Sequence, residues 1–567
     1  MVSRRAVLLG SCVGIAGLGW ARRGASAEAD AELNRLIADS GAADRALDPV
    51  SKGQTTFVDP LSDAYAERRL RAKMAEKGRL DRIGRAGLSP TGQLAYDVFR
   101  YTLDEALAAF SSGTFLINRM TPLDPSFGLQ VQFPDAFSSN SEHGIERLRG
   151  FGGYLRQIVA RLKEGQAKGY IQPKIIVTNV LAQIDLMLGQ KIEDTPFYKS
   201  VDYREVIETD VMGGFRFLKT YLEQTYLPIA RDEPGLWAQK DGARIYAAAL
   251  RRHTTTDLGA EEIHDLGLAE VARIRGELEA ARQAIGFQGD LPALFEHIRS
   301  DPQFYYTQPQ DLLDRFKAIE ARIWQGIPRL FNHKPEAPFE VRPLPGLGAA
   351  RGTGYYSLGP PDGVSPGVLY FNMSMLSTRP IPTLETLTLH EGIPGHHFQG
   401  TLAEENTDLP DILRFGLRAN GGFTAYTEGW GLYAESLGKA LGMFADPYQW
   451  FGHLDFEMLR AVRLVVDTGL HAKGWTRDRA IAFMTDNTSM APKDIRVEID
   501  RYIASPGQAT AYKVGELKIQ ELRKKAETGL GAAYDIRAFH DQILMTGAMP
   551  LAILEAKIDR WIDARPN

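Results

Sequence analysis

Leu387-Thr-Leu-His390-Glu391-Gly-Ile-Pro394-Gly395-His396-His397 places three imidazoles and a carboxylate within eight residues. In the helical zinc motif His-Glu-x-x-His, both histidines bind the ion and the glutamate acts as general base on the zinc-bound water. The residue types here therefore indicate a metal site, with His390 as one ligand and Glu391 as the base.

The spacing of the histidines differs from that motif, because His390 and His396 are six positions apart. An unbroken helix would separate them by about 9 Å of rise and roughly 120° of rotation. Two ligands about 2.1 Å from one zinc ion cannot easily point that far apart. We therefore expect the helix to end near Glu391 and a second helix to begin at His396.

The residues between the histidines support this break. Gly392, Pro394 and Gly395 disfavour helical geometry, and Pro394 pushes Ile393 away from helical angles. The second ligand is predicted to be His396. The alternative is His397, which falls on nearly the same helical face as His390 but gains no advantage without the same break.

A catalytic zinc site takes a third protein ligand and keeps an open position. The best candidate is Glu428, because Gly429 and Gly431 would let its helix approach closely. Aromatic residues recur at helical spacing and would pack that helix down; these are Tyr426, Trp430 and Tyr433. Glu435 lies two turns beyond Glu428 and could orient a ligand histidine. The alternative for Glu428 is a solvated helix carboxylate.

Three segments carry a resemblance to a known family: the His390–His397 run, Thr427-Glu-Gly-Trp-Gly-Leu-Tyr-Ala-Glu435, and Pro506-Gly-Gln-Ala-Thr-Ala-Tyr-Lys513. Together they look like the bacterial family catalogued as domain of unknown function 885 (DUF885), which is grouped with zincin-type metallopeptidases. The resemblance covers most of the chain and implies a zinc peptidase with a mainly α, zincin-like fold. The longer histidine spacing departs from the usual zincin motif and leaves His396 and His397 as alternatives.

The N-terminus reads as an export signal over residues 1–27. It has the arginine pair Arg4-Arg5, an apolar run and a small-residue cleavage site ending at Ala27. The arginine pair favours the twin-arginine route, which leads to the periplasm or the medium. Cleavage after Ala27 would remove Cys12, the one cysteine, and would change the net charge from −5 to −9. A lipid anchor on Cys12 is the alternative.

The remaining chain is predicted to be mainly α-helical. Residues 28–335 form a helical N-terminal region, and residues 336–567 form the metal-binding catalytic region, packed with it as one continuous domain. Within the second region, three short β-rich segments begin at Phe339, Gly354 and Val368 and predict a small sheet beside the cleft. An edge strand there could pair with an extended peptide, or the hairpin could be purely structural.

Further site residues are predicted after the metal motif. Tyr512 is the first candidate for an oxyanion donor and His471 the second, while Arg501 could anchor a substrate carboxylate. Tyr370 and Asn372 on the sheet are predicted substrate contacts. Arg463, Asp467 and His471 form a polar row on one helix that could serve the site or only its packing.

We therefore expect an exported metallopeptidase that uses one zinc ion to hydrolyse short peptides. The charge balance predicts no nucleic-acid partner, and no apolar stretch of the mature chain is long enough to span a membrane. One rival is hydrolysis of another amide, such as a cell-wall or N-acyl linkage. Another is a metal- or peptide-binding protein without catalysis. Exo- or endopeptidase action and the oligomeric state stay open.

Overall fold

Amphipathic helices form most of the protein, as the spacing of its apolar residues predicts. The computed structural model describes residues 10–139, 141–344, 354–418 and 422–565, with side chains from residue 26 onward. The predicted arginine pair of the export signal and the side chain of Cys12 lie outside the described residues. Helix α1 (Gly10–Leu47) runs through the predicted cleavage site after Ala27.

The bounds of the elements are as follows. The first helices are α1 (Gly10–Leu47), α2 (Asp63–Ile83), α3 (Pro90–Ser111), α4 (Thr114–Met120), α5 (Leu129–Ser139), α6 (Gly144–Lys168), α7 (Lys174–Leu188), α8 (Arg204–Val206), α9 (Gly213–Tyr221), α10 (Gly242–Thr254), α11 (Ala260–Ile285), α12 (Leu291–Ser300) and α13 (Pro309–Leu330). After the strands β1 (Phe339–Pro343), β2 (Gly354–Ser357) and β3 (Gly367–Phe371) follow α14 (Leu384–Leu387), α15 (His396–Glu405), α16 (Asp411–Arg414), α17 (Thr424–Ser436), α18 (Pro447–Ala472), α19 (Arg477–Asn487), α20 (Pro492–Ala504), α21 (Ala511–Leu530), α22 (Ile536–Leu544) and α23 (Leu551–Asp563). Between α14 and α15 lies the π turn η11 (Thr388–Gly392), which carries His390 and Glu391.

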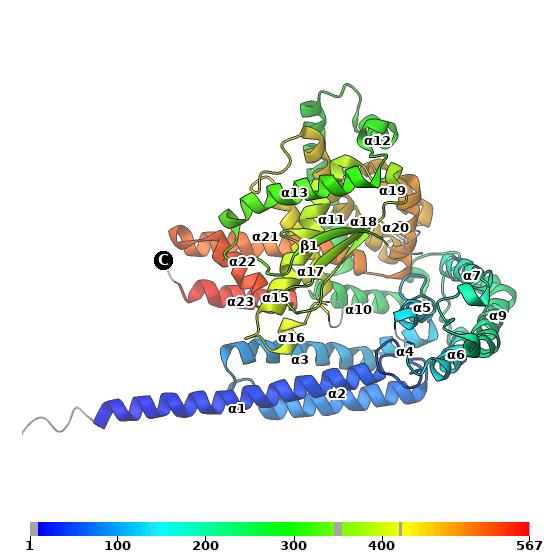
Figure 1. Cartoon of the computed structure of the whole chain (residues 1–567), viewed down its shortest axis with the longest axis horizontal. Helices are drawn as coiled ribbons and strands as arrows, with labels where there is room; N and C mark the ends of the chain where they lie inside the picture. Colours follow the sequence, from blue (N-terminus) through cyan, green and yellow to red (C-terminus); the bar gives the residue numbers. More distant parts are fainter. Residues whose placement is uncertain (1–9, 140, 345–353, 419–421, 566–567) are drawn as a thin grey trace, which may run out of the picture.

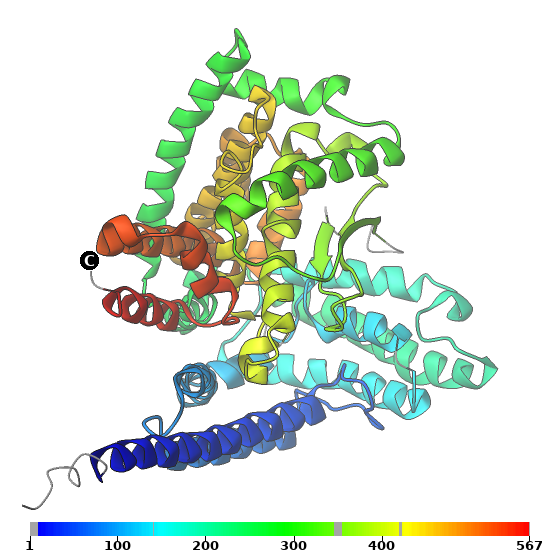
Figure 2. The ribbon, with the colours of Figure 1, turned by 60° about the vertical axis from the view of Figure 1, so that its left-hand side comes forward.

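The helices are arranged around a central group that carries the metal motif. In Figure 1, α1, α2 and α3 lie along the lower side, and α5, α6, α7 and α9 form a lobe at the right. Helices α15, α17 and α18 pass through the middle, with α13 above them and α21 to α23 at the left. The turned view in Figure 2 keeps α13 and the α1–α2 pair on opposite sides of this centre. None of the helices in the described part of the chain has the length and apolar character that crossing a membrane demands.

The small sheet predicted before the metal motif is present, with strands at the expected residues. Its order is β1-β3-β2, with β1 parallel and β2 antiparallel to β3. Strand β3 lies in the centre, and Leu369 and Phe371 are buried in the core, where Phe371 meets Phe316 of α13. This arrangement leaves β2 as an edge strand.

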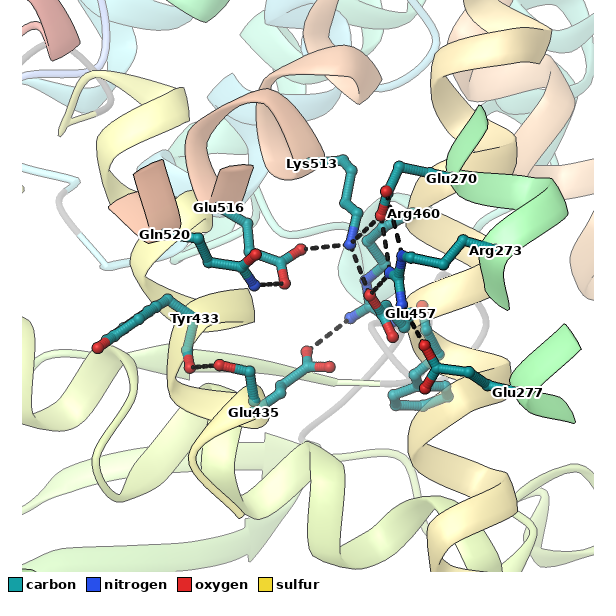
Figure 3. Close-up of polar contacts among 12 residues, drawn as sticks. Glu270, Arg273, Glu277, Tyr433, Glu435, Glu457, Arg460, Lys513, Glu516 and Gln520 are labelled. Atoms are coloured by element: carbon teal, nitrogen blue, oxygen red, sulfur yellow. Dashed lines mark hydrogen bonds and ion pairs between the residues drawn. The ribbon is translucent and has the colours of Figure 1, made fainter. Parts of the chain in front are cut away.

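A buried ion network joins three long helices behind the metal motif. Lys513 of α21 is fully buried, and its Nζ lies 2.7 Å from Glu457 of α18 and 3.1 Å from Glu270 of α11. A third carboxylate, Glu516, lies 2.8 Å from the same nitrogen. Figure 3 shows Lys513 between Glu516 on one side and the pair Glu270 and Glu457 on the other. Because a buried charge is costly without its partners, this network fixes the relative positions of α11, α18 and α21.

Lys513→Met is expected to lower the free energy of unfolding by about 3–5 kcal/mol, because it leaves buried carboxylates without their ammonium partner. Denaturant titration of the purified protein measures this. The matched control is Lys518→Met on the same helix, where the ammonium pairs with Glu521 and Glu555 near the surface. That change is expected to cost about 0–1 kcal/mol. Equal stability losses for the two variants would contradict a special role for the buried network.

Candidate metal centre

The helix is interrupted between His390 and His396, as the spacing of these histidines predicts. Helix α14 passes into the π turn η11, which ends at Gly392, and Ile393 is extended with φ −117° and ψ 119°. Helix α15 then begins at His396. The last turn before the break is a π turn where an ordinary helical turn was expected; such turns are frequent at functional sites.

Gly395 makes the tight return possible. A Cβ atom at this position would lie 1.8 Å from the carbonyl oxygen of His390 and 2.4 Å from that of Leu389. Any side chain would therefore collide with the end of η11. The absence of a side chain at Gly395 lets α15 start directly against the turn that carries His390.

Helix α17 packs closely on the same turn because two glycines face its neighbours. A Cβ atom on Gly431 would lie 2.6 Å from Cε1 of His390, and one on Gly429 would lie 2.6 Å from Cα of Gly515 in α21. Trp430, fully buried, donates its indole N–H to the carbonyl oxygen of Pro394 at 2.9 Å. The close approach predicted from these glycines is therefore present.

Three predicted ligands converge on one point. Nε2 of His390 lies 3.4 Å from Oε2 of Glu428, and Nε2 of His396 lies 3.5 Å from the same oxygen. All three donor atoms lie within 4.8 Å of one another. Ligands at about 2.1 Å from a tetrahedral zinc ion are about 3.4 Å apart, so these residues fit such an ion.

His390 is held in one orientation from behind. Its Nδ1 lies 2.7 Å from Oε1 of the buried Glu435, to which it donates its proton, so the Nε2 lone pair faces His396 and Glu428. Arg460 of α18 lies 3.5 Å from the same oxygen of Glu435. Burial alone would lower the pKa of His390, but Glu428 and Glu435 outweigh it and raise that pKa to about 9. The two carboxylates therefore favour positive charge here: a proton on Nε2 of His390 when no ion is bound, or a metal cation in its place once that proton leaves and exposes the lone pair.

The paired histidines have separate surroundings. His396 lies at the convergence point, and its Nδ1 has no hydrogen-bond partner among the described residues. His397 is fully buried elsewhere: its Nε2 donates to the carbonyl oxygen of Ala337 at 3.1 Å and its Nδ1 accepts from the Tyr356 hydroxyl at 2.9 Å. The structure therefore brings His396, and not His397, to His390 and Glu428.

Glu391 lies beside the edge strand of the sheet. Its Oε2 accepts a hydrogen bond from the backbone N–H of Tyr356 in β2 at 3.2 Å. The side chain is partly exposed, in contrast to the buried His390. The contacts of Glu391 with Tyr356 and of Glu435 with Arg460 were not predicted from the sequence. They join residues that are far apart in the chain, and no local pattern indicates them.

Two of the predicted site residues have structural roles. His471 is buried; its Nε2 donates to the carbonyl oxygen of Tyr502 at 3.0 Å, and its Nδ1 accepts from the N–H of Leu236 at 3.3 Å. No ring N–H remains for an oxyanion, which corrects the catalytic assignment. Asn372 is also buried, and its Oδ1 accepts from the backbone and hydroxyl of Ser374. It shapes the turn after β3, which corrects its assignment as a substrate contact.

The other predicted residues are more accessible. Tyr370 is partly buried, and its ring centroid lies 5.5 Å from that of the exposed Tyr355. Tyr512 is partly buried, with its hydroxyl 3.4 Å from Arg501, whose side chain is 25% exposed. Asp467, in the middle of the polar row, accepts from the N–H of Gly507 at 3.0 Å and so holds the turn before Tyr512.

Comparison with known proteins gives a family and a shared fold. A family described as bacterial protein of unknown function (DUF885) matches residues 48–558. A crystal structure from Colwellia psychrerythraea, provisionally described as a lipoprotein, is 27% identical with a TM-score of 0.81 and covers 95% of this chain and 99% of its own. A protein of unknown function from Shewanella oneidensis, also provisionally described as a lipoprotein, is 17% identical with a TM-score of 0.68, covering 93% and 98%. The curated proteins contain no match.

His396→Ala is expected to weaken binding of Zn²⁺ by at least about 100-fold, since changes to partners outside the ligand set already cost 10–100-fold. Titration of the purified protein with zinc against a competing chelator measures the affinity. The matched control is His397→Gln, which can still bond to Ala337 and is expected to keep zinc affinity within about threefold. Loss of zinc binding in the His397 variant alone would reverse the assignment of the second ligand.

Proposed function

The chain belongs to the bacterial family DUF885, and we propose that it is an exported zinc metallopeptidase that hydrolyses short peptides. The observation that carries the proposal is the convergence of His390, His396 and Glu428, with Glu391 directly following the first ligand. Two imidazoles and one carboxylate form a ligand set of catalytic zinc sites, which keep a further position open. We assign the arrangement of η11, α15, α17 and the sheet to a zincin-like plan.

The zinc ion would supply Lewis-acid polarisation of the substrate carbonyl and a water molecule of lowered pKa. Glu391 accepts a proton from the attacking water and passes it to the leaving amide nitrogen. Hydrolysis breaks the C–N bond; the water oxygen joins the acyl carbon, and both water protons end on the released amine. Tyr512 is the proposed hydrogen-bond donor to the oxyanion that forms on the carbonyl oxygen.

Strand β2 supports a peptide as the substrate. It is one of the two edge strands of the sheet among the described residues, and the N–H of Tyr356 on that edge contacts the proposed base. An extended peptide that pairs with this edge would lie with its backbone along the site and its side chains alternating to either side. The large helical shell around a short metal motif favours short peptides over folded proteins.

Glu391→Gln is expected to lower kcat on a mixed peptide pool by about 10²–10⁴-fold, because the amide cannot take up the proton. Zinc content, measured on the same sample, should stay at one ion. Glu405→Gln on α15 is the control, since its oxygen can still accept from the N–H groups of Glu336 and Ala337. Unchanged turnover in the Glu391 variant, or cleavage of cell-wall fragments without cleavage of peptides, would contradict the proposed activity.

Export through the proposed signal predicts a mature protein that begins at Glu28. N-terminal sequencing and intact mass of the protein recovered from the periplasm measure this. The two solved relatives are provisionally described as lipoproteins, so the informative alternative is an acylated Cys12 at the N-terminus. A mass increase from lipid at Cys12 would contradict cleavage after Ala27.

A further inference from the structure

A cluster of charged and aromatic residues lies where α18, α20 and α21 meet. The Nε of Arg463 donates to the hydroxyl of Tyr502 at 2.8 Å, and its Nη2 donates to Glu498 at 3.0 Å. The guanidinium also lies over the ring of Tyr512, 4.4 Å from its centroid. Arg501 completes the group through its Nη1, 3.2 Å from the other oxygen of Glu498. We call these five residues the Arg463 cluster.

The cluster carries more positive than negative charge. It holds two guanidinium groups and one carboxylate, which gives a net charge of +1. Burial would raise the pKa of Glu498, but Arg501 and Arg463 outweigh it and lower that pKa to about 2, so this carboxylate is ionised. The nearby Asp500 is engaged elsewhere, because it accepts from Arg477 at 2.5 Å. Buried charges are normally balanced by opposite charges. The net charge of +1 therefore makes the cluster complementary to one further anion.

One side of the cluster is accessible and one is not. The side chain of Arg463 is 7% exposed, and its Nη1 has no hydrogen-bond partner among the described residues. Arg501 is 25% exposed and Tyr512 is partly buried, so these two form the open side. The Nη2 of Arg501 makes one short contact, to Oε1 of Gln508 at 2.8 Å, and a long one to Tyr512. A planar guanidinium in this position suits a carboxylate.

Two helices of the cluster, α21 and α18, contact the elements that carry the proposed metal ligands. Helix α21 touches α17 at Gly429, the residue after Glu428, through Gly515, and Tyr512 lies about one turn before that contact. Helix α18 passes behind His390, where Arg460 contacts Glu435, and Arg463 is one turn further along. One helical turn is about 5.4 Å, comparable to one or two residues of extended peptide at about 3.3–3.6 Å each.

We propose that Arg501, with Arg463 behind it, binds the C-terminal carboxylate of the peptide substrate, so that the enzyme removes one or two residues from the C-terminus. This inference rests on the proposed peptidase function and adds the substrate class: peptides with a free C-terminus. Arg501 sets the position of the cleaved bond by holding the end of the chain. Arg463 adds positive charge to the floor of the same site.

The test compares a tetrapeptide with a free carboxyl terminus, the same peptide with a C-terminal amide, and an amide peptide ending in Glu. With the zinc-loaded full-length enzyme, kcat/KM is expected to be at least about 100-fold higher for the free acid, as for loss of a charged hydrogen-bond pair. Mass spectrometry should show release of one or two C-terminal residues. Arg501→Gln is expected to raise KM for the free acid at least about tenfold with little change in kcat, and to remove the preference.

Arg477→Gln, which changes an arginine bonded to Asp500 of α20, is the control and should keep the preference. Binding of the acid and the amide to the Glu391→Gln variant, measured by calorimetry, separates recognition from turnover and should show the same preference. Equal cleavage of acid and amide would overturn this inference while leaving the peptidase function in place. Full activity on the amide ending in Glu would assign the site to a side-chain carboxylate and overturn it too. No cleavage of any peptide would overturn both proposals.

Discussion

The return of the chain between His390 and His396 is the constraint on which the candidate site depends. Two imidazoles six positions apart reach a common point only because η11 ends at Gly392 and α15 begins again at His396. Gly395 permits this, since any side chain there would meet the carbonyl oxygens that end the turn. Trp430 then fixes the loop from the other side through its hydrogen bond to Pro394. Backbone sterics therefore set the histidine geometry before any ion contributes.

The surroundings of this loop are rigid because charged groups are buried in matched sets. Glu435 of α17 orients His390 and lies near Arg460 of α18, and the Lys513 network shares α18 with this pair through Glu457. Each set loses stability if one partner is removed, so α17, α18, α11 and α21 are held in one arrangement around the shared helix α18. The accessible groups, Glu391 and Arg501, lie at the edges of this frame. Rigid ligands with partly exposed reactive groups are what hydrolysis at a fixed ion requires.

Local sequence patterns were sufficient to predict three features: the helix break between His390 and His396, the position of Glu428 facing these histidines, and the small sheet. Gly392, Pro394 and Gly395 lie within four consecutive residues, and the three strands are found at the predicted segments, because alternation and turn residues act over a few positions. Residues whose roles depend on distant partners were not predictable in this way. His471 bonds to Leu236 and Tyr502, and Glu391 is held by Tyr356, contacts that no periodicity records. The polar row Arg463, Asp467 and His471 does lie on one helix, α18, as predicted. Its spacing alone could not decide whether these side chains serve the site or the packing.

The account depends most directly on one ion bound by His390, His396 and Glu428. Anomalous X-ray diffraction at the zinc absorption edge, on crystals of the protein purified with zinc, locates such an ion. The expected result is a single peak about 2.0–2.2 Å from Nε2 of both histidines and from a carboxylate oxygen of Glu428. A peak coordinated by His397, a peak away from α17, or none at full zinc occupancy in solution would contradict the account.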